Sequence, residues 1–121
     1  MSRRRLQFAW RTDTGRVRVH NEDAVSVHPD CRLVVIADGI GGASAGEVAS
    51  GFATRAVSDC FRGGAPLPEQ NDEARERARE AVEAANGIIW ESARVTPRYA
   101  GMGTTIVVGY AGPDWLVFAH V

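Results

Sequence analysis

The chain has 121 residues and a formal net charge of −1, with 45% hydrophobic and 24% charged residues. This composition is typical of a globular domain, and the length suits one domain or part of one. A charge so close to zero excludes the broad basic surface of most nucleic-acid-binding domains. The sequence has no apolar run near the ~18 residues of a membrane span and no signal-peptide pattern. We therefore expect a cytoplasmic protein with no nucleic-acid or membrane partner.

Three strands are predicted in the first third of the chain. Val17 and Val19 alternate with polar residues, which indicates a half-buried strand over residues 16–20. Residues 24–28 continue the extended pattern after Asn21. Residues 33–37 are all apolar and β-branched in their middle, which predicts a central strand covered on both faces. This strand runs into a glycine-rich loop over residues 38–42.

Two helices and a β-hairpin are predicted next. Ser44 and Glu47 have the spacing of a capping box, and apolar residues at helical spacing follow as far as Phe61. Gly63 ends this helix, and a second helix is predicted over residues 73–94. Residues 103–110 and 115–121 are predicted strands of a hairpin. Strands, then helices, then strands predict an α+β fold with a largely antiparallel sheet. Because the last strand ends without a turn, we expect an incomplete domain.

Three carboxylates are candidate metal ligands: Glu22, Asp23 and Asp38. They lie where strands meet loops, and carboxylates brought together repel one another unless a cation neutralises them. Such oxygen ligands suit Mg²⁺ or Mn²⁺. Asp38 is placed to bridge two ions, and the backbone carbonyl of Gly39 to add a ligand. Alone, Glu22 and Asp23 also suit a solvated turn, and Asp38 a strand-end cap.

Arg18 is a candidate phosphate ligand. On an extended strand its side chain shares a face with His20 and Glu22. A guanidinium beside a two-metal site can hold a phosphoryl group through two hydrogen bonds. Two other phosphate-binding motifs are excluded. The chain has no lysine for a P-loop, and Ser44 occupies the third glycine position of a dinucleotide-binding fingerprint.

Four motifs, in order, resemble those of bacterial protein phosphatases 2C, the metal-dependent PPM-type phosphatases. Residues 12–24 resemble the first motif, and residues 35–42 with 46–50 resemble the second. Residues 102–107 resemble the third, and residues 118–121 are similar to the strand that enters a Gly-Asp-Ser-Arg motif. The resemblance covers about residues 8–121, so we expect residues 1–121 to be the N-terminal part of a single phosphatase domain, with residues 1–7 flexible.

The resemblance implies a four-layer α-β-β-α sandwich, here truncated, and hydrolysis of phosphoserine and phosphothreonine in proteins with two Mn²⁺ or Mg²⁺ ions. By this resemblance Asp38, Glu22 and Asp23 are catalytic metal ligands, Gly39 contributes its carbonyl, and Arg18 binds phosphate. The implied partners are a phosphorylated protein substrate and a serine/threonine kinase.

The sequence departs from the family pattern in two ways. Ile40 follows the Asp38-Gly39 pair where many eukaryotic members have a histidine, which leaves the general acid unassigned. The Gly-Asp-Ser-Arg motif and the later metal-binding aspartates are absent from these 121 residues. The alternative is therefore a non-catalytic remnant or a module that binds phosphoproteins.

Overall fold

The structure, a computed structural model, describes residues 5–121. Within this range the strands are β1 Asp23–His28, β2 Leu33–Ile40, β3 Gly103–Thr104, β4 Val107–Ala111 and β5 Leu116–His120. The helices are α1 Ala45–Arg62 and α2 Asn71–Val95, with 3₁₀ turns at Pro29–Cys31 and Pro97–Tyr99. The expected flexibility of residues 1–7 concerns in part residues 1–4, which lie outside the described residues, and it stays a prediction.

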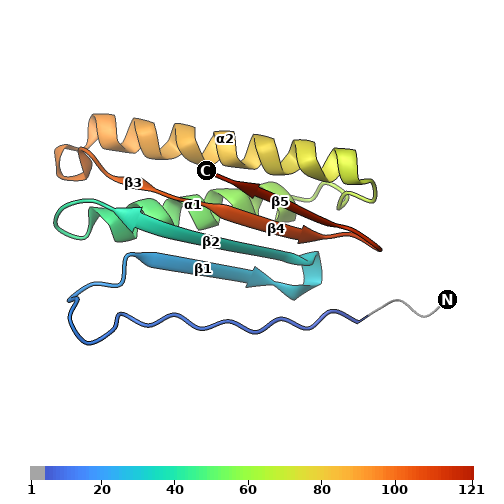
Figure 1. The fold of residues 1–121 in the computed structure, drawn as a ribbon. Coiled ribbons are helices and arrows are strands. Elements are labelled where there is room, and N and C mark those ends of the chain that lie inside the picture. Colours follow the sequence, from blue (N-terminus) through green and yellow to red (C-terminus); the bar gives the residue numbers. More distant parts are fainter. Residues whose placement is uncertain (1–4) are drawn as a thin grey trace.

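The strands form an antiparallel sheet in the order β1-β2-β4-β5, and the short β3 pairs with the end of β2 (Figure 1). The predicted strand over residues 103–110 is interrupted between β3 and β4. There, the Thr105 amide donates to the carbonyl of Asp38 at 2.9 Å, and the Asp38 amide donates to the Thr105 hydroxyl at 3.2 Å. The α+β class and the antiparallel sheet are confirmed.

Helices α1 and α2 cover one face of the sheet (Figure 1). The inward residues of β2, which are Leu33, Val35 and Ala37, are fully buried beneath them. Both helices present small side chains inward, which lets them pack closely on each other and on the sheet. The buried alanines are Ala45, Ala49, Ala53, Ala56, Ala74, Ala78, Ala81 and Ala85. The described residues thus form one helical layer and one sheet of the expected sandwich.

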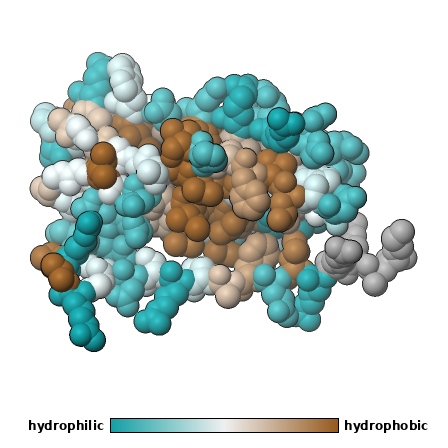
Figure 2. All heavy atoms as spheres, viewed as in Figure 1, coloured by the Kyte–Doolittle hydropathy of each residue, from teal (hydrophilic) through white to brown (hydrophobic). Residues whose placement is uncertain are grey.

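The opposite face of the sheet is open. Ile36 of β2 is 47% exposed and Phe118 of β5 is 64% exposed, although both lie in the middle of their strands. Figure 2 shows hydrophobic side chains gathered across the centre of this face. The prediction that β2 is covered on both faces is therefore wrong for the described residues. Within residues 5–121 only the helical layer covers the sheet.

Two local predictions before α1 are also wrong. The described residues contain no strand over 16–20, and Val17 and Val19 are 93% and 87% exposed. Alternation alone did not produce a strand, because no neighbouring backbone pairs with this segment in the described part of the chain. The capping box does not form either. Ser44 has a φ of 65°, its Oγ donates to the carbonyl of Ala43, and no side-chain hydrogen bond caps the helix.

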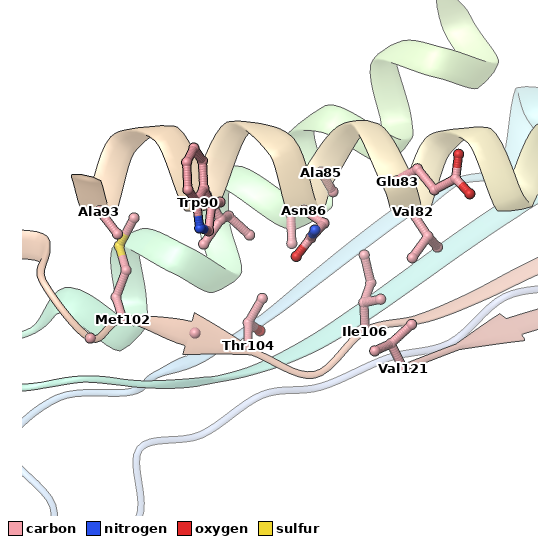
Figure 3. A pocket seen from close by; sticks show the side chains of 14 residues that line it. Val82, Glu83, Ala85, Asn86, Trp90, Ala93, Met102, Thr104, Ile106 and Val121 are labelled. Carbon is pink, nitrogen blue, oxygen red and sulfur yellow. The ribbon is translucent and has the colours of Figure 1, made fainter. Parts of the chain in front are cut away.

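An apolar groove of about 670 Å³ lies between α2 and the segment from β3 to β4. Figure 3 shows Val82, Trp90, Met102 and Ile106 among the side chains that line it. None of the candidate ligands Glu22, Asp23 and Asp38 lines this groove, so it does not coincide with the acidic site.

Neither α1 nor α2 is long and apolar enough to cross a membrane, and the described residues contain no other helix of that length.

Candidate metal centre

Asp23 and Asp38 lie directly opposite each other across strands β1 and β2. Cross-strand partners project on the same face of a sheet. Asp38 lies two residues from both Ile36 and Ile40, so it shares their face, which is the open one. Both carboxylates therefore lie on the open face, near one end of the sheet. The pairing follows from the register, and the sequence alone predicted only that the two residues lie at strand ends.

Two residues that sequence reasoning missed hold the backbone at this pair. The Thr105 hydroxyl lies 3.2 Å from the amide of Asp38, which donates to it, and the Thr105 amide donates back to the carbonyl of Asp38 at 2.9 Å. The Asn21 carboxamide oxygen accepts a hydrogen bond from the amide of Asp23 at 3.1 Å. The side-chain nitrogen of Asn21 also donates to the hydroxyl of Thr12 at 2.8 Å. These hydrogen bonds thus hold the backbone of both aspartates. Residues 12–24 and 102–107, the first and third motifs, contain all of these partners.

The Glu22 backbone connects the loop before β1 to the end of β2. The amide of Gly39 donates to the carbonyl of Glu22 at 3.0 Å. This bond continues the β1–β2 ladder one step beyond the Asp23–Asp38 pair. Glu22 is half-buried, whereas both aspartates are exposed.

The pKa of Asp23 is raised above its usual value. The largest cause is desolvation of its carboxyl group, followed by a hydrogen bond to Asp38 and the negative charge of Asp38. Glu22 raises it further, while the positive charge of Arg18 lowers it. Arg18 thus lies within electrostatic reach of Asp23. Arg18 does not reach this position as part of a strand, because residues 16–20 form no strand.

The Asp23–Asp38 pair has the donor chemistry of a cation site. Opposed carboxylates that repel each other are relieved by a cation, and their oxygens are the ligands that Mg²⁺ and Mn²⁺ prefer. The described residues contain no group of three or more Asp, Glu, His or Cys side chains that could close around an ion. The carboxylate oxygens of Asp23 and Asp38 therefore suit a divalent cation, but binding such an ion requires further ligands from other residues.

The family profile described as protein phosphatase 2C matches residues 15–121, almost the whole chain. The chain belongs to the protein phosphatase 2C family. The serine/threonine phosphatase stp of Listeria monocytogenes is 36% identical over 119 residues, which cover 96% of this chain and 47% of the relative. The serine/threonine protein phosphatase PstP of Mycobacterium tuberculosis is 36% identical over 118 residues, 96% of this chain and 21% of PstP.

Solved structures of the family have the same fold. The M. tuberculosis PstP structure superimposes with a TM-score of 0.79 at 33% identity and covers 92% of this chain and 44% of that structure. Stp1 of Staphylococcus aureus gives a TM-score of 0.81 at 36% identity, over 90% of this chain and 43% of Stp1. A structure of the PstP catalytic domain in complex with two manganese ions gives a TM-score of 0.78 at 32% identity. The chain thus spans less than half of the length of these relatives.

We expect Asp23→Asn to stabilise the metal-free chain at neutral pH. A raised pKa in the folded state means that the protonated form of Asp23 is favoured by folding. Protonation of Asp23 therefore adds to the free energy of unfolding below the unfolded-state pKa, and this contribution is lost as the pH rises through the folded-state pKa. An uncharged amide removes the repulsion from Asp38 that remains at neutral pH, which for facing like charges is worth about 0.2–1 kcal/mol.

Urea unfolding followed by tryptophan fluorescence at neutral pH and at a pH below the usual aspartate pKa measures this effect. The midpoint of Asp23→Asn should exceed that of the wild type at neutral pH, and the two should converge in acid. An equal gain at both pH values would contradict a charge effect. Asp13→Asn is a control at an exposed loop aspartate outside the pair.

Proposed function

We propose that residues 1–121 are the N-terminal part of a Mn²⁺- or Mg²⁺-dependent serine/threonine protein phosphatase domain. The observation that carries this proposal is the Asp23–Asp38 pair, held face to face at the end of the open sheet in a chain of the protein phosphatase 2C family. The named relatives stp and PstP are serine/threonine phosphatases. The PstP catalytic domain has been solved with two manganese ions.

We assign the metal-facing positions to Asp38, Asp23, Glu22 and the carbonyl of Gly39. Two divalent ions, when bound, supply Lewis-acid activation of water and neutralise charge on the phosphoryl group. Asp38 and Asp23 provide the negative charge that holds such ions, and their backbones are fixed by Thr105 and Asn21. A ligand set held this way needs little rearrangement when a cation enters.

We assign Arg18 to the phosphate group of the substrate. Its charge acts on the Asp23 carboxyl group, which supports a position beside the metal-facing side chains. A guanidinium offers two parallel N–H donors to a phosphoryl group, and it keeps its charge at every physiological pH. The substrate class is a phosphorylated protein. The cytoplasmic location and a serine/threonine kinase as partner stay predictions from the sequence.

A chimera tests the function directly. Residues 1–121 replace the matching N-terminal part of the M. tuberculosis PstP catalytic domain, which supplies the remaining half. With Mn²⁺, we expect this chimera to release phosphate from a phosphothreonine peptide, and chelation of the metal to stop the reaction.

The alternative of a non-catalytic remnant or phosphoprotein-binding module makes the opposite prediction. A chimera that folds and binds Mn²⁺ but leaves the peptide intact would favour that alternative. The unaltered PstP catalytic domain is the positive control for the peptide and the metal.

A further inference from the structure

Gly46, in the first turn of α1, lies against the Glu22 side chain. A Cβ atom built on Gly46 would overlap Oε2 of Glu22 and lie 2.9 Å from its Cδ. The Glu22 carboxylate therefore contacts the backbone of α1 at Gly46, and a side chain at position 46 would displace it. First-turn amides lack intrahelical partners, and the N-terminal end of a helix favours negative charge.

Gly39 completes this contact from the sheet. A Cβ on Gly39 would overlap the carbonyl oxygen of Gly46 and lie 2.6 Å from its carbonyl carbon. The end of β2 and the start of α1 thus touch backbone to backbone, and the Gly39 amide also donates to the carbonyl of Glu22 at 3.0 Å. The two glycines let the helix, the strand and the Glu22 carboxylate meet at the end of the sheet that carries Asp38.

The two glycines differ in what a methyl group would displace. At Gly39 the obstacle is backbone of α1, so a side chain there must separate the helix from the sheet. At Gly46 the nearest obstacle is the far end of the Glu22 side chain, which can rotate away, and a Cβ there would also lie 2.9 Å from the backbone carbonyl carbon of Gly39, which must shift slightly. Gly51, in the same helix, is a matched control, because a Cβ added there would meet no atom within 4 Å.

We propose that Gly46 is a positioning residue for Glu22: the missing side chain at this position seats the carboxylate against the first turn of α1, at the acidic end of the open sheet. The proposal rests on the proposed function only where it treats Glu22 as metal-facing. The seating itself is a property of the chain without metal. The negative charge of Glu22 acts on Asp23, which places the seated carboxylate within reach of the acidic pair.

A double-mutant cycle on the 121-residue chain tests the seating. Gly→Ala in a helix is normally stabilising, so Gly51→Ala should raise the urea unfolding midpoint. Gly46→Ala should fail to raise it, or lower it, because the new methyl group expels Glu22. In a Glu22→Ala background the carboxylate is gone and only the close Gly39 backbone contact remains, so the same Gly46→Ala change should be clearly less unfavourable than in the wild type.

Each outcome of the cycle decides the proposal. An equal effect of Gly46→Ala in both backgrounds would overturn it. If Gly46→Ala alone does not fold, folding of the double variant supports the seating, and failure of the double variant contradicts it. The cycle uses no metal, so it stands even if the proposed phosphatase function fails.

A second measurement asks whether the position of the Glu22 carboxylate affects Mn²⁺ affinity. Free Mn²⁺, counted by electron paramagnetic resonance in the presence of the chain, gives the affinity of the half-site. Gly46→Ala should lower this affinity about tenfold, in the range of changes next to metal ligands, while Gly51→Ala leaves it unchanged. Because this chain lacks the further ligands, the same comparison is made in the PstP chimera where the half-site alone binds too little Mn²⁺ to count. An unchanged affinity of Gly46→Ala there would contradict a role of Gly46 at the metal site, and the unfolding cycle decides the seating without metal.

Discussion

Asp38→Asn should abolish most turnover of the PstP chimera. The substitution keeps the shape of the side chain and removes the negative charge that faces Asp23 across the β1–β2 pair. Changes to residues that support metal ligands typically cost about 10–100-fold, so loss of a carboxylate proposed to bind the metal itself should cost more than that. The measurement is steady-state hydrolysis of p-nitrophenyl phosphate and a phosphothreonine peptide under saturating Mn²⁺.

Arg18→Ala is the matched comparison, because it should act on a different kinetic quantity. A phosphate ligand binds the ground state and the transition state alike, so its loss should mainly raise KM. A metal ligand acts on the chemical step, so its loss should mainly lower kcat. Near-wild-type kcat in Asp38→Asn would show that the central ligand has been misassigned.

The sequence predicted the elements that depend on local pattern. The helical spacing of apolar residues predicted α1 and α2. Helix α2 begins at Asn71 and ends at Val95, within two residues of the prediction. These features need only one helix and the face it buries, which is information that a single segment carries.

The rest of the fold depends on partners that a single segment does not reveal. Val17 and Val19 alternate as strand residues do, yet no strand pairs with them in the described range. The apolar run of β2 indicated two covered faces, but coverage of the second face depends on another layer. Ile36 is therefore exposed although its own sequence context is that of a core strand.

The candidate site also combines features that one segment predicts with features that depend on contacts between segments. Residue type and order predicted Glu22, Asp23 and Asp38, because carboxylates at strand ends have a recognisable chemistry. The roles of Thr105 and Gly46 depend on distances between segments that lie far apart in the sequence. Both residues stand within motifs that resemble the family, so the motif positions were recognised while the physical reason for each residue required the fold.

We expect the 121-residue chain to self-associate through the open face of the sheet. Val34 of β2, Gly109 of β4 and Phe118 of β5 lie side by side in the register, and the missing side chain at Gly109 leaves Val34 and Phe118 close together. Ile36 and Val107 extend this surface, and both are more than 40% exposed. Contiguous apolar faces and unpaired edge strands such as β5 favour association in water.

Sedimentation velocity over a range of concentrations measures this association. Phe118→Glu places a charge in the centre of the open face and should shift the chain strongly toward monomer, since burying an unpaired charge between two sheets is costly. Ile88→Glu is the control, because Ile88 is 46% exposed on α2 in the helical layer, which lies on the other side of the sheet. A wild-type chain that stays monomeric and unfolds cooperatively would show that the open face tolerates water without a covering layer. Equal dissociation by Phe118→Glu and Ile88→Glu would mean that association depends on net charge and not on the open face.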